Sequence, residues 1–494
     1  MGNVYNFLMA FSAAMGGLLF GYEIGVIGQV LAMDSTFGVY YGLTSLVDGK
    51  YVATDANTSR TGDITSLFLV GCLVGALAVS WMADVIGRKK SILVGGVLFT
   101  AGAVLQTFSN GFGMLIAGRI IGGAGIGILS MVAPLYIAET APAHLRGRMV
   151  TVQQLMITIG IFVASCINAI IIKTVDGDTK WRLALGMQMV PGVVLFFLTF
   201  IMPESPRWLA NRDQDAEALR TLAKLRSVSQ DDPAVIAEHR EIKESIEMER
   251  QIGTANWSEL LKPGILNRTV YGFLNQMFQQ WTGINYNMYY APKLIERMGF
   301  NKDDADIPFT IANNFINLIG TFPGMYLIER SGRRKLFLWG ALGMGISQLL
   351  TCLFANLSTN HGKGFSWAAI FAVYGFVLNF AATWGPVVWV YQSEIFPLRV
   401  RSKGTGFATM SNWGNNAIIG KVGPIMTANI EFYTYLVFGI IALTAGVYVY
   451  FFIPETMGKS LEDMDVVFGA TPTTHHAAQK ELEEAEVEAT KAKA

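Results

Sequence analysis

The amino-acid sequence predicts an all-α polytopic membrane protein, with 12 transmembrane helices in two pseudo-symmetric six-helix bundles and a cytoplasmic helical linker. Three observations predict this fold class. Of the 494 residues 52% are apolar and only 15% are charged, whereas roughly 25% are charged in a soluble protein. Twelve apolar runs are long enough to cross about 30 Å of hydrocarbon as helices. Three motifs of the first half of the chain also recur, in the same order, in the second half.

The charged residues are concentrated in two short regions of the chain. Of the 74 Asp, Glu, Lys and Arg residues, 21 lie in residues 204–262 and 13 in residues 455–494. The net charge is zero, so we expect no nucleic-acid partner. The three cysteines lie in apolar runs, and neither a disulfide framework nor a zinc site is expected. No nucleophile and base pattern points to an enzyme.

The apolar runs are continuous and not alternating, which favours helices over the strands of a membrane barrel. The first run lacks a basic start and contains Glu23, so we expect it to stay as a membrane helix and not to act as a secretory signal. The predicted helices are 6–31, 64–83, 91–110, 112–138, 148–173, 183–202, 268–295, 307–328, 336–356, 366–393, 404–428 and 433–453.

Basic residues in the short loops predict the orientation. They follow the even-numbered helices, as in residues 88–90 after the second helix and 333–335 after the eighth. The positive-inside rule then places these loops and both termini in the cytoplasm, and we expect a multi-pass protein of the plasma membrane. The segment 32–63 is then outside, and Asn57 in its Asn-Thr-Ser sequence is a candidate N-glycan acceptor.

The internal repeat divides the chain into two halves. Residues 87–90 (GRKK) recur as 332–335 (GRRK), Glu139 and Arg146 recur as Glu394 and Arg401, and 203–205 (PES) recur as 454–456 (PET). Such a repeat is the layout of transporters that rock two bundles around a central site. We expect an N-terminal six-helix bundle (1–203), a cytoplasmic helical linker (204–263), a C-terminal six-helix bundle (264–454) and a largely disordered cytoplasmic tail (455–494).

The charged linker has two interpretations. One is a solvated connection, and the other is a helical subdomain that latches the two bundles together.

Eight motifs together resemble the sugar porter family of the major facilitator superfamily, from the first helix to the segment after the last. They are 17–23 (GLLFGYE), 84–90 (DVIGRKK), Gly118-Arg119, 139–147 (ETAPAHLRG), 203–208 (PESPRW), 279–285 (QQWTGIN), 384–386 (WGP) and 454–456 (PET). The motifs are specific for the family and much less so for one sugar. The resemblance implies the major facilitator fold, transport of a neutral monosaccharide and no cofactor, the proton being the coupling ion.

Glu23 and Arg119 are ionisable residues inside predicted membrane helices. Each costs roughly 2.5–3.5 kcal/mol to insert, so each is a functional candidate and needs a partner. Arg119 is the natural counter-ion of Glu23. The resemblance implies that an acid at the Glu23 position takes up and releases the proton while the arginine tunes it. The family usually has Asp at the position of Glu23. The alternative interpretation of Glu23 and Arg119 is a static ion pair that only joins two helices.

A sugar site needs amides for hydrogen bonds to hydroxyl groups and aromatic faces for the apolar side of the ring. The second half supplies most such residues. The predicted substrate-binding residues are Phe20, Gln154, Gln279, Gln280, Asn285, Tyr289, Asn317, Trp384, Trp389 and Asn412. The resemblance implies all of these except Tyr289 and Trp384, which rest on residue type and position. Taken singly, a membrane Asn or Gln more often links helices than binds a ligand.

Charged residues at the cytoplasmic helix ends form a further set, and the resemblance implies that they are an inner gate of ion pairs. The predicted gate residues are Asp84, Arg88, Glu139, Arg146, Glu329, Arg333, Glu394 and Arg401. Basic residues alone would set the topology, whereas the acids would not be needed for it. Lys421 has no such role; it either extends toward the membrane surface or pairs with an acid or an acidic substrate.

These observations predict a proton-coupled monosaccharide symporter that works by alternating access, with a hexose as the first candidate substrate and a pentose as the second. We expect a monomer in the lipid bilayer. Three alternatives stay open: a facilitative sugar uniporter, a non-transporting sugar sensor, and a carrier of an acidic sugar.

Overall fold

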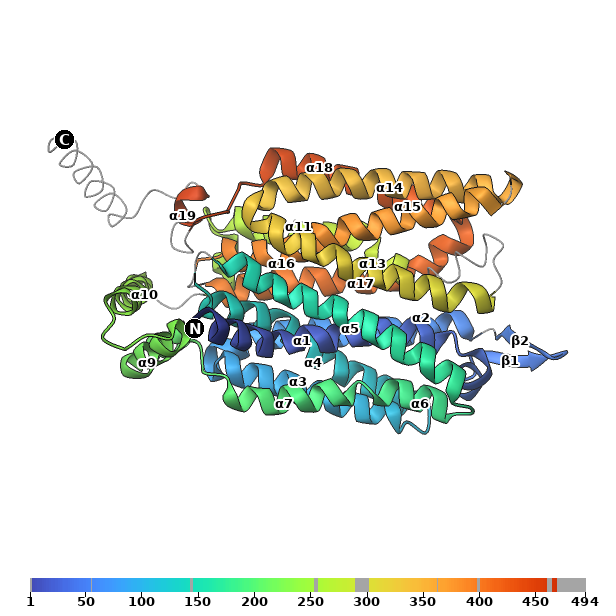
Figure 1. Cartoon of the computed structure of the whole chain (residues 1–494), viewed down its shortest axis with the longest axis horizontal. Helices are drawn as coiled ribbons and strands as arrows, with labels where there is room; N and C mark the ends of the chain where they lie inside the picture. Colours follow the sequence, from blue (N-terminus) through green and yellow to red (C-terminus); the bar gives the residue numbers. More distant parts are fainter. Residues whose placement is uncertain are drawn as a thin grey trace.

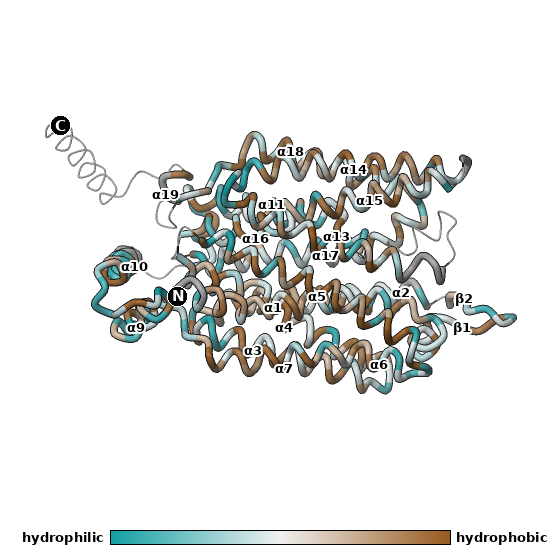
Figure 2. Tube along the Cα trace, viewed as in Figure 1, coloured by the Kyte–Doolittle hydropathy of each residue, from teal (hydrophilic) through white to brown (hydrophobic). Residues whose placement is uncertain are grey.

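The computed structural model describes residues 2–54, 56–142, 145–252, 256–288, 302–361, 363–397, 400–459 and 464–468. Long helices run side by side along the long axis of the molecule (Figure 1). Hydrophobic residues extend along these helices, and hydrophilic residues gather in α9 and in the turns at the helix ends (Figure 2). The predicted all-α membrane fold is confirmed. We call the end with the N-terminus, α9 and α10 the linker side and the opposite end, with β1 and β2, the hairpin side (Figure 1).

Each half contributes six predicted membrane helices, of which one in the first half and two in the second are interrupted. The first half contains α1 (Gly2–Leu31), α2 (Asn57–Ile86), α3 (Arg88–Thr107), α4 (Phe112–Thr140), α5 (Arg146–Thr174), α6 (Thr179–Gly186) and α7 (Met189–Ile201). The second half contains α11 (Leu266–Trp281), α13 (Lys302–Arg330), α14 (Arg333–His361), α15 (Lys363–Ala382), α16 (Trp384–Ile395), α17 (Arg401–Ile430) and α18 (Tyr433–Phe452). The halves meet where α2 packs on α17 and α5 packs on α13.

The predicted helices 183–202 and 366–393 each remain one apolar span long enough to cross a membrane, but each contains a break that was not predicted. The first is broken between α6 and α7, and the second at Thr383 between α15 and α16. Pro191 and Pro386 follow these breaks, and a proline both lacks the N–H for the helical bond and clashes with the carbonyl four residues earlier. Those carbonyls belong to Met187 and Ala382, next to the two breaks.

Nine segments among the described residues are long and apolar enough to cross a membrane. The helices α11, α13 and α17 are not among them. The predicted helix 268–295 is interrupted: α11 has 16 residues and is followed by a turn at Gly283, where φ is 91°. Residues 289–295 of that prediction lie outside the described residues. Three asparagines in α13 and four in α17 lower the hydropathy of these helices. These polar helices are the ones that supply most of the predicted sugar-binding amides.

A β-hairpin in the outer segment was not predicted. The strands β1 (Thr44–Val47) and β2 (Lys50–Ala53) pair antiparallel, with Val47 opposite Lys50. They follow a short π-helix, η1 (Asp34–Gly38). Asp48 and Gly49 form the turn with φ of 48° and 75°, and an Asp-Gly pair is the usual sequence of such a two-residue turn.

The linker folds as a small helical unit. It contains α8 (Pro206–Asn211), α9 (Asp215–Arg226), α10 (Pro233–Ile252) and the 3₁₀ helix η3 (Trp257–Leu261). Its apolar core is built from Leu209, Ala218, Leu222, Ala223, Val235, Ile242 and Ile246. Trp208 Nε1 donates to the carbonyl of Asp84 at 2.9 Å, and Arg226 Nη1 donates to that of Thr140 at 2.9 Å. These bonds attach the linker to the first half. The short helix α19 (Met464–Val467) is the last described element, and the predicted disordered tail lies mostly outside the described residues.

Candidate functional site

An internal cavity lies between the two halves. Its lining residues are Phe20, Ile24, Gln154, Ile157, Ile161, Gln279, Gln280, Ile284, Asn285, Met288, Asn317, Phe380, Trp389 and Asn412. They come from α1 and α5 of the first half and from α11, α13, α15, α16 and α17 of the second, with three in the segment that follows α11. The cavity leaves about 50 Å³ for the centres of water molecules, which is room for a few waters. The halves therefore enclose a narrow chamber that combines amides with apolar side chains.

The predicted substrate residues divide into three groups. Eight of them line the cavity: Phe20, Gln154, Gln279, Gln280, Asn285, Asn317, Trp389 and Asn412. Trp384 is not in this lining; it is fully buried, and its Nε1 donates to the carbonyl of Phe337 at 2.9 Å. Its indole also packs against the Phe337 ring, with the ring centroids 4.8 Å apart. Tyr289 lies outside the described residues.

The amides of the cavity bond to one another. Asn412 Nδ2 donates to Gln279 Oε1 at 2.8 Å, and Gln279 Nε2 donates in turn to the carbonyl of Trp384 at 2.9 Å. Gln280 Nε2 donates to Gln279 Oε1 at 3.2 Å, and Gln280 Oε1 accepts from Asn285 Nδ2. A sugar hydroxyl can both donate and accept, so it can replace these amide–amide bonds one for one.

Sequence reasoning missed the amide of Gln276. Its Oε1 accepts from Asn412 Nδ2 at 2.6 Å, and its Nε2 donates to Gln392 Oε1 at 2.6 Å. Gln276 lies one turn before Gln279 and Gln280 on α11, and this spacing was the available signal. The residue holds Asn412 in position from outside the cavity lining.

Sequence reasoning also missed the apolar wall. The unpredicted lining residues are Ile24, Ile157, Ile161, Ile284, Met288 and Phe380. An apolar residue in an apolar membrane helix carries no mark of the face on which it lies, because the helix lacks a polar stripe. At one edge of this wall the Phe20 ring lies 4.9 Å from that of Trp413, whose Nε1 donates to Ser130 Oγ across the two halves at 3.0 Å.

The carboxylate of Glu23 and the guanidinium of Arg119 form a buried ion pair between α1 and α4. Glu23 is 1% exposed and Arg119 is 2% exposed, and Arg119 Nη1 donates to Glu23 Oε1. Arg119 Nε also donates to the carbonyl of Ile64 at 2.9 Å, and its guanidinium lies 4.4 Å from the ring centroid of Phe68. Glu23 Oε2 has no hydrogen-bond partner. Since the adjacent Ile24 lines the cavity, this acid is next to the chamber.

On the linker side, each half has the same ion pair. Arg88 donates from Nε and Nη2 to the two oxygens of Glu139, both at 2.9 Å. Arg333 donates in the same way to Glu394, at 3.2 and 2.7 Å. Ser205 and Thr456 donate their hydroxyls to these acids at 2.6 and 2.8 Å. Asp84 and Glu329 lie 3.5 Å from the arginine four residues later.

These arginine–glutamate pairs join helices within one half, and other bonds cross between the halves. The backbone N–H of Arg148 donates to Glu329 Oε1 at 2.9 Å, and Ser402 Oγ donates to Asp84 Oδ1 at 2.7 Å. The charge of Arg401 also acts on Glu139 across the boundary. Arg146 and Arg401 each donate from Nε to a carbonyl of their own half, Ala138 and Phe396, at 3.2 Å. The predicted gate residues therefore gather where the halves meet.

The repeated Pro-Glu-Ser/Thr motif caps a helix in each half, a role that the sequence analysis did not assign. Glu204 Oε1 accepts from the backbone N–H of Arg88 at 2.9 Å and of Lys89 at 3.1 Å, at the start of α3. Glu455 accepts in the same way from Arg333 at 2.9 Å, at the start of α14. A carboxylate is favourable there because it satisfies free N–H groups at the positive end of the helix dipole. Burial nevertheless raises the pKa of the Glu204 carboxyl.

Lys421 lies on the hairpin side and pairs with an acid. Its Nζ is 3.5 Å from Asp63 Oδ1 of α2, and the two side chains are 52% and 39% exposed. Of the alternatives for this lysine, the structure shows the pair with an acid. Lys421 is not among the residues that line the cavity, and none of those residues is charged.

The sequence is similar to curated transporters over nearly its whole length. A family model described as sugar (and other) transporter matches residues 9–468. The major facilitator-type transporter ecdD of Aspergillus rugulosus is 34% identical over 92% of this chain and 86% of that protein. The low-affinity glucose transporter HXT4 of Saccharomyces cerevisiae is 34% identical, with 92% and 79% covered. The hexose transporter HXT11 of the same yeast is 35% identical, with 93% and 82% covered.

The fold matches solved structures of XylE, a proton:xylose symporter. Its structure bound to 6-bromo-6-deoxy-D-glucose superposes with a TM-score of 0.83, at 29% identity, covering 95% of this chain and 100% of that one. The inward-open form of XylE from E. coli scores 0.70, at 28% identity, with 93% and 98% covered. The chain therefore belongs to the sugar transporter family of the major facilitator superfamily, and it is a transporter and not an enzyme.

Proposed function

We propose that the protein is a proton-coupled monosaccharide symporter that works by alternating access. The observation that carries this proposal is the Glu23–Arg119 pair beside the cavity. A buried carboxylate with one paired and one unpartnered oxygen can take a proton without a large rearrangement. Protonation cancels the attraction to Arg119 and so changes the relative stability of the conformations that bind sugar.

The linker side is the cytoplasmic side in this proposal, and both termini lie in the cytoplasm of a plasma-membrane protein. The basic segments 88–90 and 333–335 support this orientation. The hairpin and Asn57 are then outside, where Asn57 is the candidate N-glycan acceptor; its side chain now donates to the carbonyl of Leu43 at 2.8 Å. One chain encloses the whole cavity, which supports a monomer as the working unit.

The bonds of Arg148 to Glu329 and of Ser402 to Asp84 hold the linker side closed. They must break for the sugar to leave on that side, so these residues act as the inner gate in the proposal. The TM-score, which is higher for the sugar-bound XylE structure than for the inward-open one, agrees with a closed linker side.

The substrate proposed is a neutral monosaccharide, with a hexose first and a pentose second. Amides such as Gln280 and Asn412 bind hydroxyls in both directions, and Trp389 and the isoleucines offer apolar faces. The uncharged lining disfavours an acidic sugar, whose carboxylate would lose its water without gaining a counter-ion.

Uptake into proteoliposomes tests the proposal. With an acidic exterior, the wild type is expected to accumulate labelled glucose or xylose, whereas Glu23→Gln is expected to exchange sugar across the membrane without accumulating it. Asp63→Asn is the control, because it removes an exposed acid outside the cavity. Accumulation by Glu23→Gln equal to that of the wild type would refute the coupling, and absence of sugar exchange in the wild type would refute sugar transport.

A facilitative uniporter is the second candidate, and the same pair supports it. A permanent ion pair between α1 and α4 would need no proton exchange. In that case the wild type equilibrates sugar and never concentrates it, whatever pH gradient is imposed.

A further inference from the structure

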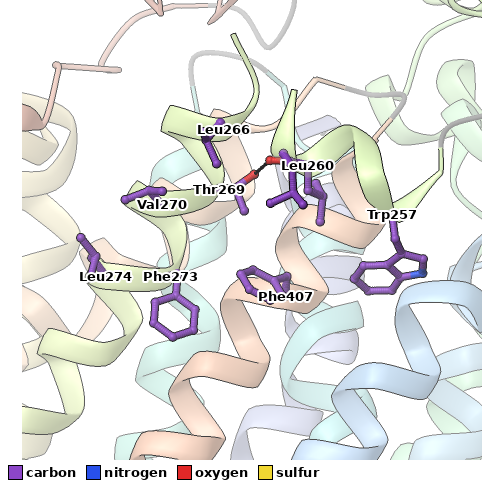
Figure 3. Close-up of a pocket in the computed structure, with 9 residues that line it drawn as sticks. Trp257, Leu260, Leu266, Thr269, Val270, Phe273, Leu274 and Phe407 are labelled. Atoms are coloured by element: carbon purple, nitrogen blue, oxygen red, sulfur yellow. Dashed lines mark hydrogen bonds between the residues drawn. The ribbon is translucent and has the colours of Figure 1, made fainter. Parts of the chain in front are cut away.

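An apolar groove opens on the outside of the second half, at the linker side. Side chains of η3, α11 and α17 surround it (Figure 3). Its volume is about 430 Å³, which is in the range of small-molecule sites. The lining residues are Trp257, Leu260, Leu261, Leu266, Thr269, Val270, Phe273, Leu274 and Phe407. The groove is separate from the sugar cavity and shares no residue with it.

The groove has fixed walls. The hydroxyl of Thr269 donates to the carbonyl of Leu260 at 2.9 Å, which ties η3 to α11 and occupies the one hydroxyl of the lining. The Phe273 and Phe407 rings lie 5.5 Å apart and close the floor between α11 and α17. A capping box between Asn256 and Glu259 holds the start of η3. The groove is therefore formed by fixed contacts of the folded protein, and its walls offer almost no hydrogen-bonding groups.

The groove lies at the level where the headgroups of the linker-side leaflet meet its acyl chains. From Leu266 to Leu274, α11 rises by about 12 Å from its linker-side end. Leu261 is 68% exposed and Trp257 is 40% exposed, on the outer surface of a membrane-spanning bundle. A tryptophan at the end of such a bundle is typical of the interface between headgroups and acyl chains.

Cations lie at one end of the groove. Lys262 follows Leu261 directly; its side chain is 62% exposed, and its Nζ is 3.9 Å from Glu259. Lys403 precedes Phe407 by four residues, so it lies on the same face of α17, one turn nearer the linker side. Apolar walls with basic residues at one end match a phospholipid with an apolar acyl chain and a headgroup of net negative charge.

We propose that this groove binds one acyl chain of an anionic phospholipid from the linker-side leaflet, with the headgroup on Lys262 and Lys403. The tail of the protein is a poorer occupant, because residues 470–494 contain only two large apolar residues, Leu482 and Val487. The bound chain contacts α11 and α17, the helices that carry Gln279, Gln280 and Asn412.

Trp257 makes the site directly observable. Bromine atoms on a lipid acyl chain quench a tryptophan only on contact, so vesicles with increasing fractions of brominated phosphatidylglycerol or phosphatidylcholine report occupancy. The signal of the full-length protein minus that of Trp257→Phe isolates Trp257. Subtracting the signal of Trp81→Phe from that of the full-length protein isolates Trp81 in the same way. Trp81 is the matched control, because it is 67% exposed on the surface of α2 outside the groove.

The proposal expects half-maximal quenching of Trp257 at a mole fraction of phosphatidylglycerol at least threefold lower than of phosphatidylcholine. Trp81 should show no such preference, and the double variant Lys262→Gln/Lys403→Gln should reduce the ratio at Trp257 to about one. Equal ratios at the two tryptophans would mean non-specific surrounding lipid only, and an unquenched Trp257 would mean a groove closed to lipid. Either outcome would overturn the proposal, and neither depends on the transport function.

Discussion

Lys421 Nζ of α17 lies 3.5 Å from Asp63 Oδ1 of α2, so an ion pair joins the two halves on the hairpin side. Both side chains are partly exposed. Solvent screens such a pair, and exposed pairs contribute only about 0–1 kcal/mol to stability.

Lys421→Gln is therefore expected to change sugar uptake by no more than about twofold and to lower the free energy of unfolding by less than about 1 kcal/mol. Uptake assays and unfolding in detergent at low and high salt measure both effects, and Asp63→Asn should match them. A tenfold loss of uptake would show that the pair does more than join the halves.

Arg119→Gln is expected to destabilise the protein by about 3–5 kcal/mol, because it leaves the Glu23 carboxylate buried without a counter-ion. The double variant Glu23→Gln/Arg119→Gln removes both charges and should recover part of this loss. Thermal unfolding in detergent compares the single and double variants. Equal losses in the two would mean that the buried charge is not the cause.

Trp389→Ala and Trp384→Phe separate the cavity from the packing beside it. Trp389 lines the cavity, so its truncation is expected to raise the KM for sugar by roughly tenfold or more. Trp384→Phe removes the donor to the Phe337 carbonyl and should cost about 1–3 kcal/mol of stability with KM unchanged. A large rise of KM in Trp384→Phe would return this residue to the binding site.

Gly147→Leu is expected to open the linker side. A Cβ at Gly147 would lie 2.4 Å from Arg333 Nη2 and Glu329 Oε1 of the other half, and Arg333 is held by Glu394. The thiol of a Ser402→Cys variant, buried at the same boundary, should then react faster with a water-soluble reagent. Gly420→Ala is the control, because its Cβ would lie 3.5 Å from Leu69 Cδ1, an ordinary contact. An unchanged thiol rate would contradict the close approach.

Glu204→Gln tests the pH dependence of folding. Burial raises the pKa of this carboxyl from 4.5, so the folded state holds the proton more tightly than the unfolded state. The resulting stability is complete below pH 4.5 and is lost as the pH rises through the folded-state pKa. Unfolding measured from pH 4 to 7 should show this fall in the wild type and not in Glu204→Gln. Parallel curves for the two proteins would refute it.

The long continuous apolar runs, the low charge and the internal repeat were enough to predict the helical membrane fold, and the amide motif of α11 predicted one side of the cavity. The hairpin was missed although Asp48-Gly49 is a turn signal, because the segment was taken only as a loop between helices. Trp384 was misplaced because an aromatic residue beside a glycine and a proline does not show which side of a broken helix it occupies. The apolar wall was missed because residues such as Ile157 and Ile284 look like any lipid-facing residue in sequence.

The polar character of α13 and α17 has a consequence for how the protein is made. A helix rich in asparagine inserts poorly into a bilayer when it is alone. Asn314 of α13 donates to Ser165 of α5 at 2.6 Å, and Trp413 of α17 donates to Ser130 of α4 at 3.0 Å. Both partners belong to the half that is synthesised first, and that half is already apolar enough to enter the membrane unaided. The first half therefore already carries hydrogen-bond partners for polar groups of α13 and α17 when these helices are synthesised.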